Sequence, residues 1–243
     1  MGDSNHDGVS DIDSLKKGLS PRTGKRLFKD VPEGQYYTDS TAFLYQRGTI
    51  QGYKDGSFQP SKLVTRAEFV KMVMATFEEN SGSFLGFNLG GDTSTYQPFD
   101  DVHDNWYVSY INDAYRAGIV KGSVIPGTNK LQFKPNDYIT RAEAVVILSK
   151  AASVLKSTSA TVSDCKKTPF NDVKPGDWFC SAVGSAYSNG ITKGKGKNSF
   201  KPDDNLSRGE AAVLIKRTLD KESEFLSSGT KSVKDLSAPY IFP

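Results

Sequence analysis

Cysteine and histidine are scarce in this 243-residue sequence, with two residues of each type. No apolar run approaches the roughly 20 residues that a membrane helix needs, and Ala144 to Leu148 reads only as a short helix core. Neither sign of charge dominates, because 31 Lys and Arg stand against 28 Asp and Glu. Phosphate-binding surfaces need concentrated basic residues. We therefore expect no nucleic-acid partner and no membrane span.

An export signal is also missing at Met1, where the acidic stretch from Asp3 to Asp13 replaces the basic and apolar regions of such a signal. If the protein is secreted, we expect the chain to be a processed fragment. Cys165 and Cys180 are even in number, which permits one disulfide in an oxidising compartment. Two reduced, buried thiols are the alternative.

An internal repeat dominates what is present. The segment Phe28-Lys29-Asp30-Val31 returns as Phe99-Asp100-Asp101-Val102 and as Phe170-Asn171-Asp172-Val173, with a period of 71 residues both times. Each copy continues with an aromatic pair, two glycines four residues apart, an F-x-P segment and a final T-R-A-E or S-R-G-E. The aromatic pairs are Tyr36-Tyr37, Trp106-Tyr107 and Trp178-Phe179, and the last segments begin at Thr65, Thr140 and Ser207.

The second copy shows what each repeat should form. Apolar residues from Tyr107 to Tyr115 fall at helical spacing, and Gly118 favours the left-handed helix end. Residues 122–135 indicate a loop with short extended segments. Thr140 and Glu143 form a capping box that opens a second helix. We expect a mainly helical, all-α fold of three helix-pair repeats, with the second helices in a central pseudo-threefold bundle.

The repeats also set the expected boundaries. The predicted segments are an acidic calcium-loop-like stretch (1–24), repeat 1 (25–80), a linker (81–97), repeat 2 (98–153), a linker (154–168), repeat 3 (169–220) and a C-terminal tail (221–243).

In this order the motifs resemble the S-layer homology family, over residues 28 to about 219. The resemblance implies three repeats with binding grooves between neighbours, and a position outside the cell in the cell wall or S-layer. It also implies a ligand, a secondary cell wall polysaccharide that often carries pyruvate ketals. By similarity, the T-R-A-E arginine contacts the acidic sugar, with the Trp and the first-motif Asp nearby.

The residues themselves give a chemical reason for this ligand. The arginines follow the cap residue, where they should stand beside exposed N–H groups at the positive end of the helix dipole and hold a carboxylate bidentately. Because repeat 2 combines Trp106 with an intact T-R-A-E, we expect Arg141 to dominate. The candidate ligand-binding residues are Arg66, Arg141, Arg208, Trp106, Trp178, Tyr36, Asp30, Asp101 and Asp172.

Each candidate also has a structural alternative. The tryptophans are large enough to be core residues, the aspartates often tie a turn, and an arginine is often an ion-pair partner. For Glu68, Glu143 and Glu210, capping alone explains the spacing.

Residues 3–14 resemble the calcium loops of thrombospondin type 3 and dockerin-like repeats. Oxygen ligands would come from Asp3, Asn5, Asp7, the Val9 carbonyl and Asp11. Ser14 stands where a bidentate Glu is usual, so we expect weak calcium binding. A disordered acidic tail is the alternative.

No set of residues in the sequence indicates a nucleophile or an acid–base pair. We therefore expect a non-enzymatic anchor that binds cell wall polysaccharide with acidic or pyruvylated sugars. The alternative is a structural module for protein–protein contact with other S-layer proteins, or for calcium-dependent surface-layer assembly.

Overall fold

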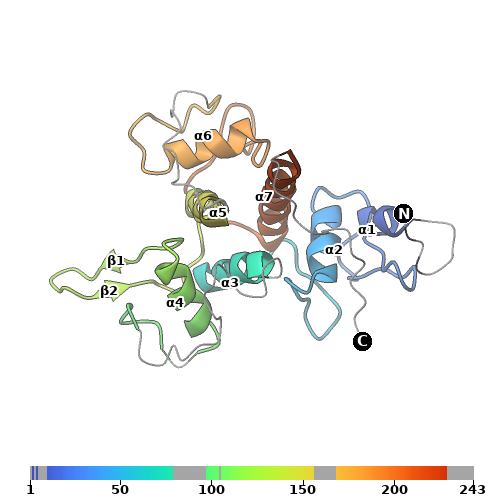
Figure 1. The fold of residues 1–243 in the computed structure, drawn as a ribbon, viewed down its shortest axis with the longest axis horizontal. Coiled ribbons are helices and arrows are strands. Elements are labelled where there is room, and N and C mark those ends of the chain that lie inside the picture. The colour runs from blue at the N-terminus through green and yellow to red at the C-terminus, as the bar shows by residue number, and fades with distance from the viewer. Residues whose placement is uncertain are drawn as a thin grey trace.

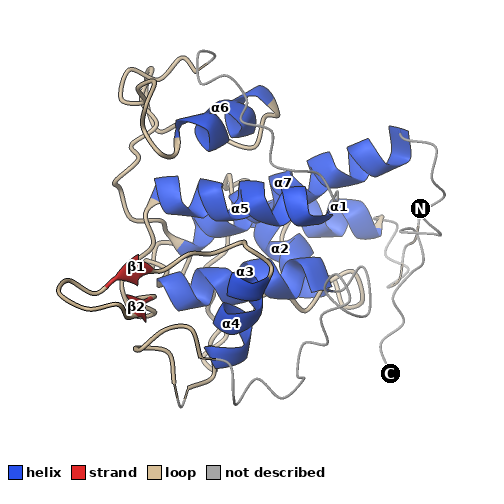
Figure 2. Cartoon of the chain, turned by 60° about the vertical axis from the view of Figure 1, so that its left-hand side comes forward, coloured by secondary structure: helices blue, strands red, loops and turns tan. Residues whose placement is uncertain are grey.

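The computed structural model describes residues 10–78, 97–103, 105–155 and 168–228, together with Gly2 and Ser4. Within these ranges the chain is mainly helical, as predicted (Figure 2). None of the described helices is long and apolar enough to cross a membrane. The elements are α1 (Asp11–Lys16), α2 (Thr38–Gln46), α3 (Arg66–Glu78), α4 (Val108–Arg116), β1 (Ser123–Val124), β2 (Leu131–Gln132), α5 (Arg141–Leu155), α6 (Cys180–Ser188) and α7 (Arg208–Ser228).

The first helix of each repeat ends where the sequence predicted. Gly48, Gly118 and Gly190 follow α2, α4 and α6 with φ of 73°, 71° and 72°, a left-handed conformation that glycine adopts without a steric penalty. The longer loop of repeat 2 forms the antiparallel hairpin β1–β2, which projects from the helices (Figure 2).

The second helix of each repeat opens with the predicted capping box. The Thr140 N–H donates to the Glu143 carboxylate at 3.0 Å, and the Glu143 N–H donates to Thr140 Oγ1 at 3.3 Å. The same reciprocal bonds join Thr65 to Glu68 and Ser207 to Glu210.

Three backbone hydrogen bonds link the repeats in a closed ring at the centre. The Val64 N–H donates to the Leu206 carbonyl (2.9 Å), the Leu206 N–H to the Ile139 carbonyl (3.0 Å), and the Ile139 N–H to the Val64 carbonyl (3.0 Å). Each residue lies just before an inner helix, so the ring fixes the starts of α3, α5 and α7. These helices surround one centre, with α2, α4 and α6 outside them (Figure 1).

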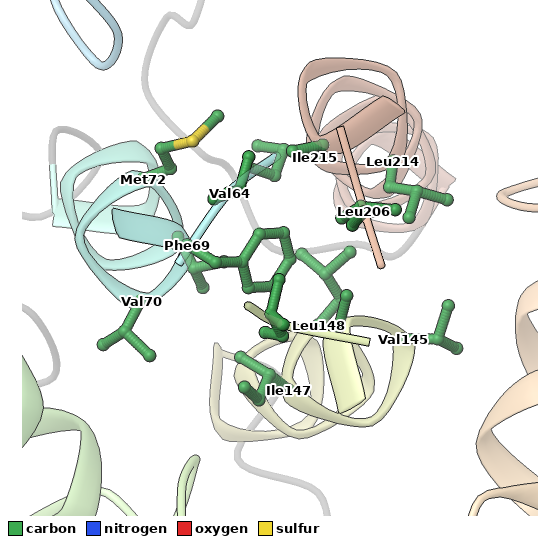
Figure 3. Close-up of a cluster of buried hydrophobic side chains, with 14 of the residues drawn as sticks. Val64, Phe69, Val70, Met72, Val145, Ile147, Leu148, Leu206, Leu214 and Ile215 are labelled. Carbon is green, nitrogen blue, oxygen red and sulfur yellow. The ribbon is translucent and has the colours of Figure 1, made fainter. Parts of the chain in front are cut away.

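One large side chain and two small ones share the centre of this bundle. Phe69, Ala144 and Ala211 occupy the same position in α3, α5 and α7, and all three are fully buried. Figure 3 shows the Phe69 ring pointing from α3 toward the other inner helices, beside Leu148. The pseudo-threefold arrangement is therefore asymmetric at its core.

The outer helices pack against inner helices of a different repeat. Helix α4 packs against α3, α6 against α5, and α2 against α7, which closes the ring between the last and first repeats (Figure 1). We name these contacts the first junction (α3 with α4), the second junction (α5 with α6) and the third junction (α7 with α2). The two helices of one sequence repeat are thus not the pair that packs together.

Candidate functional site

The first aromatic residue of each pair lies at the protein surface. Tyr36, Trp106 and Trp178 are 63%, 51% and 66% exposed. Each ring meets the following aromatic residue edge to face, at centroid distances of 5.0 to 5.3 Å. The alternative that the tryptophans fill the core is therefore wrong. Rings fixed at one edge and open on a face suit stacking on another flat or apolar surface.

Each motif arginine reaches into the following repeat. The Arg66 Nε donates to the Phe133 carbonyl, and the guanidinium lies 4.7 Å from the Phe133 ring. Arg141 makes the same two contacts with Phe200, and Arg208 makes them with Phe58. These bonds are 2.9 Å long in all three repeats, so the arginines hold the F-x-P segment of the next repeat in place.

The prediction that N–H groups are exposed at the starts of the inner helices is wrong. The Arg141 N–H donates to the Asp204 carbonyl at 2.9 Å, and the Ala142 N–H donates to the Pro202 carbonyl at 3.0 Å. The starts of α3 and α7 are paired in the same way with repeats 2 and 1. Because the third N–H belongs to the capping box, the first-turn donors are used within the protein. A ligand carboxylate has no free helix terminus here.

The side chains of Arg141 and Arg208 are buried, that of Arg66 is half-buried, and the three are partly paired. Arg66 ion-pairs with Glu143, and Arg141 Nη1 lies 3.4 Å from Glu210 Oε1. Arg208 instead donates through Nη2 to the Gln51 carbonyl at 2.9 Å. Burial lowers the pKa of Arg141, while the charge of Glu210 acts in the opposite direction. Glu143 and Glu210 therefore have a second role that their spacing did not reveal.

The aspartates of the first repeated segment, Asp30, Asp101 and Asp172, each hold a turn through backbone hydrogen bonds. Both oxygens of Asp30 accept backbone N–H bonds, from Phe58 and Gln59 at 2.7 Å each. Asp101 and Asp172 do the same for the F-x-P segments of repeats 2 and 3. Burial raises the pKa of Asp172, but hydrogen bonds from the Phe200 N–H, the Ser199 hydroxyl and the Lys201 N–H outweigh it and lower the pKa to about 2.

Residues from all three repeats meet at the third junction. Tyr36 belongs to repeat 1, Glu210 to repeat 3 and Arg141 to repeat 2. Partial burial raises the pKa of Tyr36, and the charge of Glu210 raises it further. Lys195 Nζ lies 3.5 Å from the same Glu210 carboxylate. A junction thus takes its aromatic ring, its helix start and its arginine from three different repeats.

This arrangement separates two residues that the sequence had placed together. Trp106 lies at the first junction, where Lys71 Nζ of α3 is 5.2 Å from its ring centroid. Arg141 instead ion-pairs with Glu210 of α7 at the third junction. The expectation that Trp106 and Arg141 form one strong site in repeat 2 is wrong, because neighbouring motifs of one repeat face different junctions.

Sequence reasoning missed three lysines at the junctions. Lys71, Lys62 and Lys195 occupy positions where the other repeats carry uncharged or acidic residues. Lys71 follows Arg66 by five residues, and its counterparts are Val146 and Val213. Comparing the repeats for differences, rather than for shared motifs, would have found them.

An open hollow of about 470 Å³ lies on repeat 1, and its lining includes Phe28, Tyr45, Gln51, Gly52 and Tyr53. Gly52 is required there, since a Cβ would lie 2.4 Å from the Phe28 ring. The hollow also lies beside Arg208, which donates to the Gln51 carbonyl and whose guanidinium is 5.1 Å from the Tyr53 ring. Arg208 faces the first junction, at the start of α3, because its charge and that of Glu68 both act on Lys62.

The proposed calcium ligands Asp3, Asn5, Asp7 and Val9 lie outside the described residues. Asp11 is described, and its carboxylate accepts from the Ser4 N–H and hydroxyl at 2.8 Å each. Within the described ranges, no group of three His, Cys, Asp or Glu residues is placed to hold a metal. Calcium binding at residues 3–11 stays a prediction.

Cys180 is buried at the start of α6 and is disulfide-bonded. The other cysteine of the sequence, Cys165, lies outside the described residues. The alternative of a reduced, buried thiol is therefore wrong for Cys180.

Comparison with known proteins identifies the repeats. The model of the S-layer homology domain matches residues 27–70, 98–145 and 169–212. The chain is 33% identical to Exoglucanase XynX of Acetivibrio thermocellus over 198 residues, which are 81% of this chain and 16% of that protein. It is 28% identical to S-layer protein sap of Bacillus anthracis over 216 residues, 89% of this chain and 23% of that protein.

A third relative is Amylopullulanase of Thermoanaerobacterium thermosulfurigenes, 32% identical over 198 residues, 81% of this chain and 10% of that protein. The chain thus spans less than a quarter of each of these relatives.

Proposed function

Because the chain belongs to the S-layer homology domain family, we propose that it attaches a surface protein non-covalently to the bacterial cell wall. Proteins named as an S-layer protein, an exoglucanase and an amylopullulanase are similar to this chain over most of its length. A region shared by proteins of such different activity supports a common attachment role. We propose that the chain contributes binding and no catalysis.

The ligand in this proposal is a secondary cell wall polysaccharide with acidic, pyruvylated sugars. The observation that carries it is the repetition of an exposed aromatic ring at the three junctions, with the Lys71 ammonium beside Trp106 at the first. Tyr36, Trp106 and Trp178 would receive the apolar faces of sugar rings. Arg66, Arg141 and Arg208 would supply positive charge behind those rings while holding the repeats together. Asp30, Asp101 and Asp172 would shape the F-x-P segments at the edge of each site.

Sedimentation with purified walls tests the proposal. We expect the 243-residue chain to sediment with walls and to stay in solution when the polysaccharide has been extracted from them. A Tyr36→Ala, Trp106→Ala, Trp178→Ala triple variant should lose binding while keeping its melting temperature, because all three rings are exposed.

Equal sedimentation before and after extraction would contradict the proposal. Binding that survives extraction and requires calcium would instead favour the surface-layer assembly module.

A further inference from the structure

Lys71 is a cation held over two aromatic rings at the first junction. Its Nζ lies 5.2 Å from the Trp106 ring centroid and 5.8 Å from that of Tyr110. Both distances fall within the range of a cation–π interaction. Lys71 is exposed, and in the described part of the chain it has no carboxylate partner. Its ammonium is therefore accessible to solvent beside an exposed indole.

The first junction also carries more positive charge than the others. Lys62 Nζ donates to the Tyr53 hydroxyl at 3.0 Å, and the Arg208 guanidinium lies over the same ring. The Tyr53 bond raises the pKa of Lys62, and the nearby charge of Glu68 raises it while that of Arg208 lowers it. Three cations, counting Lys71, thus stand near one carboxylate that is already used in a capping box.

At the matching positions the other two junctions are more acidic. The second junction has one cation and two carboxylates, from Arg66, Glu143 and Asp137. The third has two of each at these positions, and they pair with one another: Arg141 with Glu210, and Lys195 with both Glu210 and Asp204. Lys216, also at the third junction, is paired with Asp39 and Asp220. Valines replace Lys71 in both, at Val146 and Val213.

We propose that the first junction is the principal acidic-saccharide site of this chain and that Lys71 binds the carboxylate of the sugar. Trp106 takes the apolar face of the same ring. This inference rests on the proposed function and adds the junction and the residue. Lys71 fits the role because its ammonium is a compact point charge on a flexible side chain. The motif arginines, by contrast, already donate hydrogen bonds to carbonyls and carboxylates of the protein.

The test uses two matched sugars and one fluorescent reporter. The acidic probe is a methyl glycoside with a 4,6-linked pyruvate ketal, and the neutral probe is its 4,6-ethylidene counterpart, which lacks only the carboxylate. Trp106 and Trp178 are the two tryptophans of the chain, so a Trp178→Phe background makes Trp106 emission report the first junction. Affinities are measured by fluorescence titration, with the melting temperature as the folding control.

Lys71→Met should weaken binding of the acidic probe about tenfold, the lower end for loss of one charge-assisted hydrogen bond, and leave the neutral probe unchanged. Lys71→Arg should restore most of the affinity. Lys25→Met removes an exposed lysine that precedes the family match at residues 27–70, and it should change neither probe. Together these results would support a charge contact by Lys71.

If Lys71→Met binds the acidic probe as tightly as the parent, the inference is overturned. Equal weakening of binding to both probes would also overturn it, because it would mean that Lys71 acts through packing and not through its charge. Failure of the parent to bind the acidic probe while it still sediments with walls would also overturn it. If the parent does not sediment with walls, the proposed function itself has failed.

Discussion

Lys216 of α7 lies 3.4 Å from Asp39 of α2 and 2.8 Å from Asp220 of its own helix. The contact joins the last inner helix to the first outer helix, so it closes the ring at the third junction. The Phe43 ring, 5.1 Å from Nζ, covers the same ammonium. Repeats 1 and 3 are therefore neighbours in space although repeat 2 separates them in sequence.

Lys216→Met should lower the free energy of unfolding by about 1 kcal/mol near neutral pH, because the ion pair is only partly shielded. Burial lowers the pKa of Lys216, but the Asp220 and Asp39 carboxylates outweigh it and raise the pKa above the ordinary 10.5. A raised lysine pKa stabilises the fold fully below the unfolded value and loses that effect as pH rises through the folded value. Urea unfolding should therefore show the difference between parent and variant shrinking above pH 10.5. A difference that does not change with pH would contradict this assignment.

Glu143→Gln and Glu68→Gln form a matched pair. Both variants keep a capping side chain, but Glu143 also ion-pairs with the half-buried Arg66. Loss of that partner leaves a half-buried charge less well compensated, so Glu143→Gln should cost about 1 to 3 kcal/mol. Glu68→Gln should cost less than half as much. Thermal unfolding of both variants decides the point, and equal losses would show that capping is the whole role of Glu143.

Asp172→Asn should reduce the acid sensitivity of the chain. The pKa of Asp172 is about 2, below the ordinary 3.8, so its carboxylate stabilises the fold above pH 3.8. This contribution, about 1 kcal/mol once solvent screening is taken into account, is lost as pH falls toward 2. Unfolding free energies measured from pH 5 to pH 2 should fall more steeply for the parent than for the variant. Parallel curves would mean that Asp172 has no special role in acid unfolding.

Phe69→Ala should destabilise the whole chain by about 3 to 5 kcal/mol, because the cavity opens where all three inner helices meet. Neither Ala144 nor Ala211 can fill the space from its own helix. We expect one cooperative transition at a lower denaturant concentration, measured by circular dichroism. Separate transitions for the repeats would contradict a shared core.

Cys180 should yield no free thiol before reduction. Thiol titration of the denatured, unreduced protein should detect none, and two after reduction, since the sequence holds two cysteines. A bridge to Cys165 would close a loop of about 15 residues and add on the order of 3 kcal/mol. Two free thiols before reduction would rule out the bridge.

Much of the local structure follows from the sequence alone. Helical spacing placed the six helices of the repeats, and Ser/Thr-x-x-Glu placed the starts of α3, α5 and α7. The turn at Gly118 could be predicted because few other residues adopt its positive φ without strain. These features depend on contacts within a few residues, and the motif order added the family.

Only the tertiary structure decided which residues meet. The Arg66 contact with Phe133 spans 67 residues, and that of Arg208 with Phe58 spans 150. No periodicity within a repeat encodes such pairings, so Trp106 and Arg141 seemed to belong to one site. Closing three repeats into a ring sends the aromatic, the helix start and the arginine of one repeat to three different junctions. In the same ring, the N–H groups at the helix starts donate to carbonyls of neighbouring repeats. The sequence of a single repeat could not show these bonds.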